Sequence, residues 1–171
     1  MSLRAIPDLY VMRPSDAEET ELLTRKALNL QAPSCLCLTR QKLSNLNYPN
    51  KSLAGRGAWV LKDPAECKII IFATGSEVQL ALQVSEQLEK NKDLLHKVKV
   101  VAVPCWKLFF QQDLKYQAQV MTTKCKTRIS IEAGSTLGWE RFVGMDGLKI
   151  GIDHFGSSAP YQVLENKFGF T

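Results

Sequence analysis

The sequence lacks any long apolar run. Hydrophobic residues make up 45% of the 171 residues, yet no stretch approaches the roughly 20 apolar residues that a membrane helix needs. Charged side chains, among them Arg4, Asp8, Arg13 and Asp16, occur throughout the first 20 residues, so this segment has no apolar core of a secretion signal. The charged fraction of 23% is that of a folded protein rather than a disordered one. These absences exclude a membrane-spanning or secreted class and predict a cytoplasmic location.

The cysteines show no C-x-x-C spacing, which argues against a zinc or redox motif. Their number, 5, is odd, and reducing compartments keep thiols free. We therefore expect all of them to be reduced thiols that pack as small apolar residues. Two of them, Cys35 and Cys37, alternate on an extended segment and should point to the same face. The cysteines are Cys35, Cys37, Cys67, Cys105 and Cys125.

Acidic residues are absent from residues 22–62. Such a basic segment could face a phosphorylated metabolite, a nucleic acid or an acidic partner, or simply form a solvated basic surface. Nucleic-acid binding would need denser charge with aromatic residues interleaved, which the segment does not have. Its cations are Arg25, Lys26, Arg40, Lys42, Lys51, Arg56 and Lys62.

Histidine is also scarce, and hydrolase motifs are missing. His96 lies in a polar link, where an exposed side chain is expected, and His154 follows Asp153, a carboxylate that could tune its basicity. No H-x-x-E-H or G-x-S-x-G pattern occurs. The sequence therefore gives little support to hydrolase chemistry.

The first part of the chain, residues 1–43, predicts a strand–helix–strand unit of the parallel type. An apolar run at 9–12 fits a strand, and Asp16 is a good helix N-cap with Glu19 in capping-box register. The helix should cover 17–30, and 34–39 should form a fully buried strand. Such a unit cannot bury its apolar faces alone and implies missing neighbours. A polar connector, 44–56, follows without periodicity and is interpreted as a linker.

The second part, residues 57–171, alternates strands with helices more regularly. We predict a three-layer α/β/α fold with a mostly parallel sheet of about five strands. The β-branched run at 68–73 should be its centre. The expected strands are 57–61, at an edge, and 68–73, 98–103, 128–132 and 149–152. The expected helices are 77–90, capped by Ser76, then 106–120, a short one with Trp139 and Phe142, and 159–167, which Pro160 can open.

Two places could hold an anion. The turn at Thr74-Gly75-Ser76 leads from a strand into a helix and could bind phosphate, but it has fewer glycines than true phosphate loops, so we favour a capped tight turn. Arg40 ends a predicted strand, where ligands gather in parallel α/β sheets. Its guanidinium could grip a phosphate or carboxylate with two parallel hydrogen bonds, or form a structural ion pair.

The order of several motifs resembles transketolase from end to end. It includes R-P-S-D-A-E-E at 13–19, L-T-R-Q-K-L at 38–43, A-T-G-S-E-V at 73–78 and P-C-W-K-L-F at 104–109. E-A-G at 132–134, G-W at 138–139, V-G-M-D-G at 143–147, F-G-S-S-A-P at 155–160 and K-F-G-F-T at 167–171 continue it. The resemblance implies that 1–43 is the end of a pyrimidine-binding domain, 44–56 a linker and 57–171 a transketolase C-terminal domain.

Transketolases transfer a two-carbon ketol unit between sugar phosphates in the pentose phosphate pathway, using thiamine diphosphate and a divalent cation (Mg²⁺ or Ca²⁺). By resemblance, the residues that bind this cofactor and its metal, and the catalytic residues, lie in parts of the enzyme that this chain does not contain. No catalytic, cofactor-binding or metal-binding residue is therefore assigned here. Arg40 matches the arginine of the family that contacts the substrate phosphate. The resemblance further implies a homodimer of the full protein, with no nucleic-acid or membrane partner.

The resemblance predicts a chain that is inactive without the missing thiamine-diphosphate-binding domains, whether they belong to a longer chain or a separate subunit. Family members usually continue beyond F-G-F-T at 168–171 into a final helix, so apolar surface of the last domain should be exposed. Two alternatives are a non-catalytic C-terminal module for assembly or regulation, and part of another thiamine-dependent enzyme. The motifs at 40–41 and 155–160 argue against the second alternative.

Overall fold

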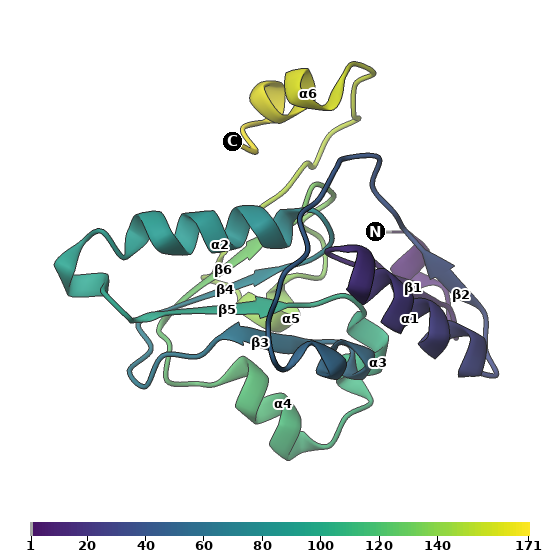
Figure 1. The fold of residues 1–171 in the computed structure, drawn as a ribbon, viewed down its shortest axis with the longest axis horizontal. Coiled ribbons are helices and arrows are strands. Elements are labelled where there is room, and N and C mark those ends of the chain that lie inside the picture. Colours follow the sequence, from purple (N-terminus) through teal and green to yellow (C-terminus); the bar gives the residue numbers. More distant parts are fainter. Residues whose placement is uncertain (1) are drawn as a thin grey trace.

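The computed structural model describes residues 2–171. Its centre is a five-stranded sheet with the strand order β3-β5-β4-β6-β7 (Figure 1). Strand β3 is antiparallel to β5, while the other pairs are parallel. The strands are β3 (Trp59–Lys62), β4 (Ile69–Ala73), β5 (Val98–Ala102), β6 (Thr127–Ile131) and β7 (Leu148–Ile150). The predicted mostly parallel sheet of about five strands is confirmed, with β3 at one edge.

Strand β4 is central because its side chains are apolar on both faces. Ile70, Ile71 and Phe72 are fully buried, and β4 pairs with β5 on one side and β6 on the other. Continuous β-branched runs are typical of strands covered on both faces.

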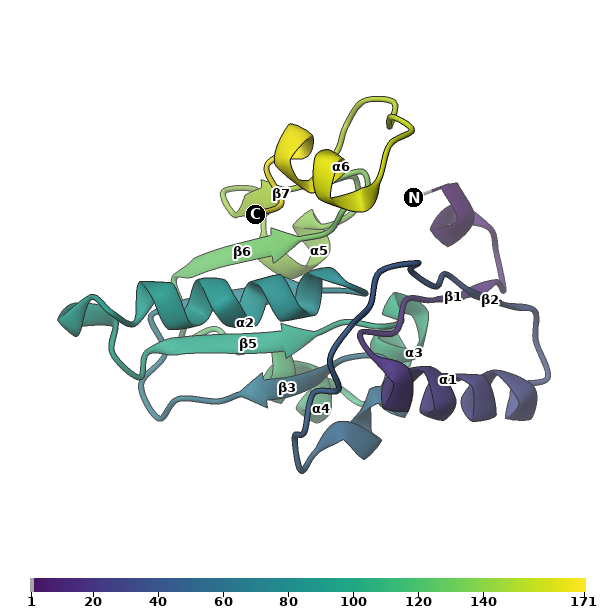
Figure 2. The same ribbon diagram turned by 45° about the horizontal axis from the view of Figure 1, so that its top comes forward.

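Helices cover both faces of this sheet, which confirms the three-layer α/β/α arrangement (Figures 1 and 2). One face packs on α2 (Glu77–Leu88) through a cluster that includes Val78, Ala81 and Ile71. The other packs on α3 (Trp106–Phe110), α4 (Leu114–Met121) and α5 (Glu140–Val143). Their cluster is aromatic, and Phe109 stacks on Phe142 with ring centroids 5.7 Å apart. The predicted single helix at 106–120 is two helices, because Asp113 caps a new one by accepting a hydrogen bond from Tyr116 N.

The amino-terminal part forms a separate two-stranded parallel sheet. Strands β1 (Tyr10–Met12) and β2 (Ser34–Leu36) pair directly and are connected by α1 (Ala17–Asn29), which confirms the predicted strand–helix–strand unit. Asp16 caps α1 as predicted. The prediction of a fully buried strand at 34–39 was wrong: β2 is shorter and half-buried, because β1 is its only partner strand among the described residues.

The second half of the expected linker is ordered by packing. A 3-10 helix, η2 (Lys51–Arg56), buries Lys51, whose ammonium donates to Asp16 at 2.7 Å and Glu18 at 2.8 Å. Gly57 then adopts φ +92°, and a Cβ there would lie 2.3 Å from Phe109 N, so only glycine fits. This close approach packs the end of η2 against α3. The bounds of the linker, 44–56, stay a prediction.

Two further local expectations differ from the structure. Glu19 does not close a capping box on Asp16; its carboxylate accepts hydrogen bonds from Ser15 N at 2.6 Å and Trp59 Nε1 at 2.7 Å. Ser76 stands at the N-cap of α2 without capping it, since its hydroxyl donates to Glu77 at 2.6 Å. The Glu19 carboxylate therefore joins α1 to Trp59 of β3, whereas Ser76 bonds the first residue of its own helix.

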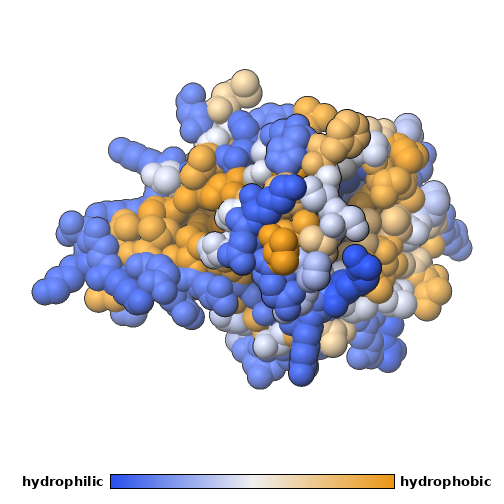
Figure 3. Space-filling model, turned by 90° about the horizontal axis from the view of Figure 1, so that it is seen from above, coloured by the Kyte–Doolittle hydropathy of each residue, from blue (hydrophilic) through white to orange (hydrophobic). Residues whose placement is uncertain are grey.

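The remaining elements are short or peripheral. The last helix, α6 (Tyr161–Phe168), follows Pro160 and lies over the same face as α2 (Figure 1). On the face seen from above, apolar residues reach the surface in several areas interspersed with hydrophilic ones (Figure 3). Two more 3-10 helices are η1 (Ser2–Ala5) and η3 (Lys92–Leu94). Among the described residues, none of the helices is long and apolar enough to cross a membrane.

The prediction of five reduced thiols was wrong for one pair. Cys67 and Cys125 form a disulfide, with Cα atoms 5.1 Å apart. The bond links the segment before β4 to the segment before β6, two loops brought together by strand pairing. Cys35, Cys37 and Cys105 are free, as expected. Cys35 and Cys37 do share a face, with Sγ atoms 3.8 Å apart.

Candidate functional site

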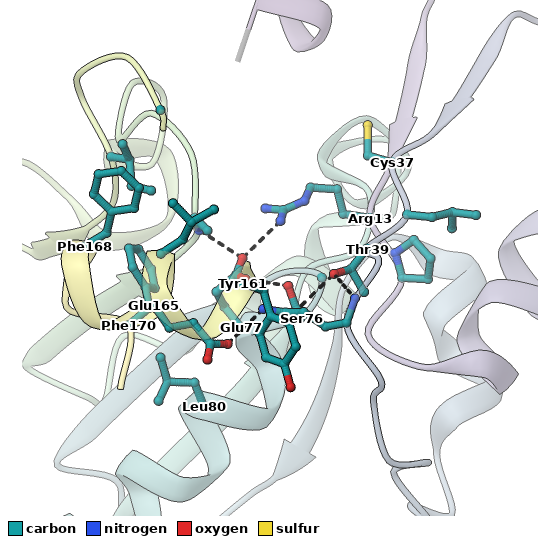
Figure 4. Close-up of a pocket in the computed structure, with 18 of the residues that line it drawn as sticks. Arg13, Cys37, Thr39, Ser76, Glu77, Leu80, Tyr161, Glu165, Phe168 and Phe170 are labelled. Atoms are coloured by element: carbon teal, nitrogen blue, oxygen red, sulfur yellow. Dashed lines mark hydrogen bonds and ion pairs between the residues drawn. The ribbon is translucent and has the colours of Figure 1, made fainter. Parts of the chain in front are cut away.

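A cavity of about 370 Å³ lies where the amino-terminal part meets the larger sheet. The segment after β2 forms one wall, and the first turn of α2 and the helix α6 form the others (Figure 4). Figure 4 shows aromatic side chains of the α6 region facing Arg13 and Thr39 across this space. The polar and charged residues of the lining are Arg13, Thr39, Gln41, Ser76, Glu77, Ser157, Tyr161 and Glu165. The site thus depends on both parts of the chain.

Arg40 lies at the rim of this cavity rather than in its wall. Its neighbours Thr39 and Gln41 line the cavity, whereas the Arg40 side chain is exposed. Among residues 2–171 it makes no ion pair or hydrogen bond, so the structural ion pair considered for it is not formed. A guanidinium without a protein partner is available to bind an external anion.

The rest of the basic segment is mostly neutralised by carboxylates from elsewhere. Arg25 pairs with Glu21, Lys51 with Asp16 and Glu18, Arg56 with Asp113, and Lys62 with Glu89. Within the part of the chain that the structure describes, Lys26, Arg40 and Lys42 have no carboxylate partner. Two of these three flank Gln41. The folded chain therefore concentrates the unpaired positive charge of the segment at this loop.

A buried ion-pair network holds the two parts together beside the cavity. Arg13, just after β1, donates to Glu132 Oε1 at 2.6 Å and to Glu77 Oε2 at 3.1 Å. Arg4 binds the same Glu132 carboxylate through two hydrogen bonds of 2.7 and 2.8 Å, and Trp139 Nε1 adds a fourth at 2.8 Å. The network fixes the end of β1 relative to the ends of β4 and β6.

The network also shifts the acid–base equilibria of its members. Burial alone would lower the pKa of Arg13, but the charges of Glu77 and Glu132 outweigh it and raise that pKa. Burial alone would raise the pKa of Glu132, but its contacts with Arg4 and Arg13 outweigh it and lower that pKa. Both groups are thus held in their charged forms, and neither is suited to donate or accept a proton near neutral pH.

A second contact ties the loop of Arg40 to the end of the chain. Gln41 Nε2 donates to Glu165 Oε1 of α6 at 2.8 Å, and both side chains are half-buried. On the other side of Arg40, the Thr39 hydroxyl accepts a hydrogen bond from Gln41 N at 3.1 Å. The loop therefore closes on itself and is attached to α6 through Gln41.

The other sequence candidates do not form a site. At the turn before α2, Gly75 N donates to Arg13 O at 3.1 Å, and a Cβ at Gly75 would lie 3.1 Å from the Arg13 guanidinium. The position where an anion would face this helix end is occupied by the Arg13–Glu77 pair. His96 is exposed as expected, and Asp153 bonds Thr136 and Ser135 rather than His154. Burial raises the pKa of the Cys37 thiol, which argues against a reactive thiolate.

Sequence reasoning assigned no role to the ion-pair network beside the cavity, although most of its members lie in motifs quoted above. Arg13, Glu77 and Glu132 are separated by more than 50 positions and meet only through the sheet topology. Glu132 ends the predicted strand at 128–132, the kind of position that also selected Arg40, and it lies in the E-A-G motif at 132–134. Glu165 lies on a helix with polar neighbours and gave no signal.

The fold and the site define a class: a three-layer α/β domain of mostly parallel strands, with an unpaired arginine at the end of a second, smaller parallel sheet. Comparison with known families matches residues 57–171 to the "Transketolase-like TK C-terminal domain" and residues 1–45 to the "Transketolase, pyrimidine binding domain". The chain belongs to the transketolase family.

Individual relatives agree with this assignment. The chain is 41% identical over 175 residues to Transketolase 10 of Craterostigma plantagineum, covering 99% of this chain and 25% of that protein. A transketolase structure from Pichia stipitis, described as a complex with sedoheptulose-7-phosphate, superposes with a TM-score of 0.89 at 32% identity, covering 99% of this chain and 24% of the other. The chain thus spans about a quarter of the length of the curated relatives it matches.

A further solved structure shares the fold at lower identity. A protein described as "Split gene transketolase, inactive beta4 tetramer" superposes with a TM-score of 0.76 at 22% identity. The match covers 99% of this chain and 55% of that one.

Proposed function

We propose that this chain is the C-terminal part of a transketolase and supplies Arg40 to bind the phosphate of a sugar phosphate. The observation that carries the proposal is the Arg40 guanidinium, exposed and without a partner at a strand-end loop that also presents Lys42. A bidentate guanidinium fits the geometry of a phosphate. The relative described with a bound sugar phosphate supports the choice of ligand.

The complete reaction needs thiamine diphosphate and a divalent cation, and this chain's residues do not fit that group. Among the described residues, no three His, Cys, Asp or Glu side chains lie together as a metal site. The helix end that could have faced a diphosphate is occupied by Arg13 and Glu77. When bound elsewhere in the enzyme, the cofactor would carry the two-carbon unit. The role of this chain is to bind and orient the substrate's phosphate end.

The domain division follows the same proposal. Residues 1–43 are the end of the pyrimidine-binding domain, 44–56 connect it, and 57–171 are the C-terminal domain. The half-buried strand β2 would be covered by the rest of its domain. That remainder belongs either to a longer chain or to a separate subunit; the solved structure of the same fold is described as a split gene transketolase. Assembly as a homodimer and a cytoplasmic location stay predictions.

The proposal is tested by Arg40→Ala in the complete enzyme, assayed with a phosphorylated and an unphosphorylated acceptor sugar. Loss of a charge-assisted phosphate contact should cost about 1.5–3 kcal/mol, which raises KM for the phosphorylated sugar by about 10- to 150-fold. Arg40→Lys keeps the positive charge but loses the two-pronged guanidinium, so its KM should lie between those of the unaltered enzyme and Arg40→Ala. Lys26→Ala removes another unpaired cation of the segment and should have no effect. An unchanged KM in Arg40→Ala would remove Arg40 from the site.

A further inference from the structure

We propose that Glu165 of α6 is a positioning residue for the phosphate-binding loop and acts on Arg40 through Gln41. This inference rests on the proposed function of Arg40 and adds a role for the last helix of the chain. Its basis is the hydrogen bond of 2.8 Å between Gln41 Nε2 and Glu165 Oε1, which joins positions 124 residues apart.

The loop around Arg40 has few other attachments. Strand β2 ends at Leu36, and Cys37 N donates the last ladder-like hydrogen bond, to Met12 O at 2.8 Å. No backbone–backbone hydrogen bond involves residues 38–43 in the described chain. Leu38 is 62% exposed, so apolar packing holds the loop weakly. The Gln41–Glu165 contact is therefore the main bond between this loop and the rest of the molecule.

The chemistry of the contact suits positioning rather than ligand binding. Glu165 is half-buried, and its carboxylate accepts a hydrogen bond from the side-chain amide of Gln41. Helix α6 is itself anchored, since Phe168 and Phe170 pack against the cluster under α2. Figure 4 shows Glu165 pointing from α6 into the cavity. Because α6 is fixed on the larger domain, its contact with Gln41 fixes the Arg40 loop relative to that domain.

A fixed loop matters because an arginine must be placed before it can bind phosphate through two bonds. Ordering a free loop on binding costs conformational entropy, which weakens affinity without changing the contacts made. Glu165 therefore acts on KM for the phosphorylated substrate and leaves kcat almost unchanged.

The test compares Glu165→Ala and Glu165→Gln in the complete enzyme. Glu165→Ala should raise KM for the phosphorylated acceptor by about fivefold, the order expected for the net contribution of one ordinary hydrogen bond, with kcat within about twofold. It should also speed amide hydrogen exchange at 38–43. Glu165→Gln retains an acceptor oxygen and should restore both values, while Gln162→Ala, at an exposed position of the same helix, should change neither.

The double variant Arg40→Ala/Glu165→Ala separates this inference from the proposed function. If Glu165 acts through Arg40, its replacement has no further effect on KM once Arg40 is absent. If Arg40→Ala raises KM and Glu165→Ala changes neither KM nor loop exchange, the positioning role is wrong and the function stands. If Arg40→Ala has no effect, the proposed function fails, while faster loop exchange in Glu165→Ala would still report the contact.

Discussion

Arg13 and Glu132 form a buried ion pair of 2.6 Å that joins the end of β1 to the end of β6. Glu132 also accepts hydrogen bonds from Arg4 and Trp139. The carboxylate is thus shared by the amino-terminal part and the larger domain. We interpret it as the main polar contact that fixes their relative position.

Replacing Glu132 with alanine should lower the free energy of unfolding by about 3–5 kcal/mol, because it breaks a largely buried ion-pair network. Arg4 and the Trp139 indole N–H lose this acceptor, and Arg13 keeps only Glu77. Chemical denaturation of the 171-residue chain measures it. The matched control is Glu21→Ala, which removes an exposed i,i+4 pair with Arg25 and should cost only about 0.3–0.5 kcal/mol. Equal losses in the two variants would contradict the role of the network.

The same carboxylate should make stability depend on acid pH. Its folded-state pKa lies below the ordinary value of 4.5, so its contribution is fully present above that pH. The contribution is lost as pH falls through the folded-state pKa. The stability difference between the natural chain and Glu132→Gln should therefore be constant from neutral pH down to about 5, then shrink. A difference that grows as the pH falls would show the opposite sign of pKa shift.

The Cys67–Cys125 disulfide should stabilise the larger domain. It closes a loop over a sequence separation of 58, for which loop-closure entropy predicts about 4 kcal/mol. Urea denaturation with and without a dithiol reductant measures this contribution, and Cys105→Ser is the control at a free cysteine. Thiol titration of the denatured, unreduced chain should find the three free cysteines. A result of five thiols would show that the bond does not form.

Sequence patterns predicted the elements that depend on local chemistry. The β-branched run of β4, the Asp16 cap and the alternation of strands and helices give the sheet, its centre and its layers. The patterns did not predict features that tertiary contacts decide. Lys51 is buried in a 3-10 helix within the predicted connector, and β2 is short because it has one partner strand among the described residues. The Cys67–Cys125 bond was missed because strand pairing, not spacing, brings these residues together.

For the candidate site, sequence reasoning selected one residue, Arg40, and its role in binding phosphate stays a prediction. Arg40 was selected by its strand-end position and its motif, and the structure leaves it exposed and unpaired. Its supporting residues could not be selected, since Gln41 meets Glu165 only after the last helix folds back over α2. Long-range contacts of this kind have no local signature in a single sequence.

We propose that this chain provides the phosphate contact of a transketolase but not the binding site of its cofactor. Calorimetric titration of thiamine diphosphate with Mg²⁺ into the purified 171-residue chain tests it most directly, with a complete transketolase as the positive control. We predict no measurable heat of binding to this chain and clear saturation in the control. Binding to the isolated chain with a micromolar dissociation constant would contradict the account.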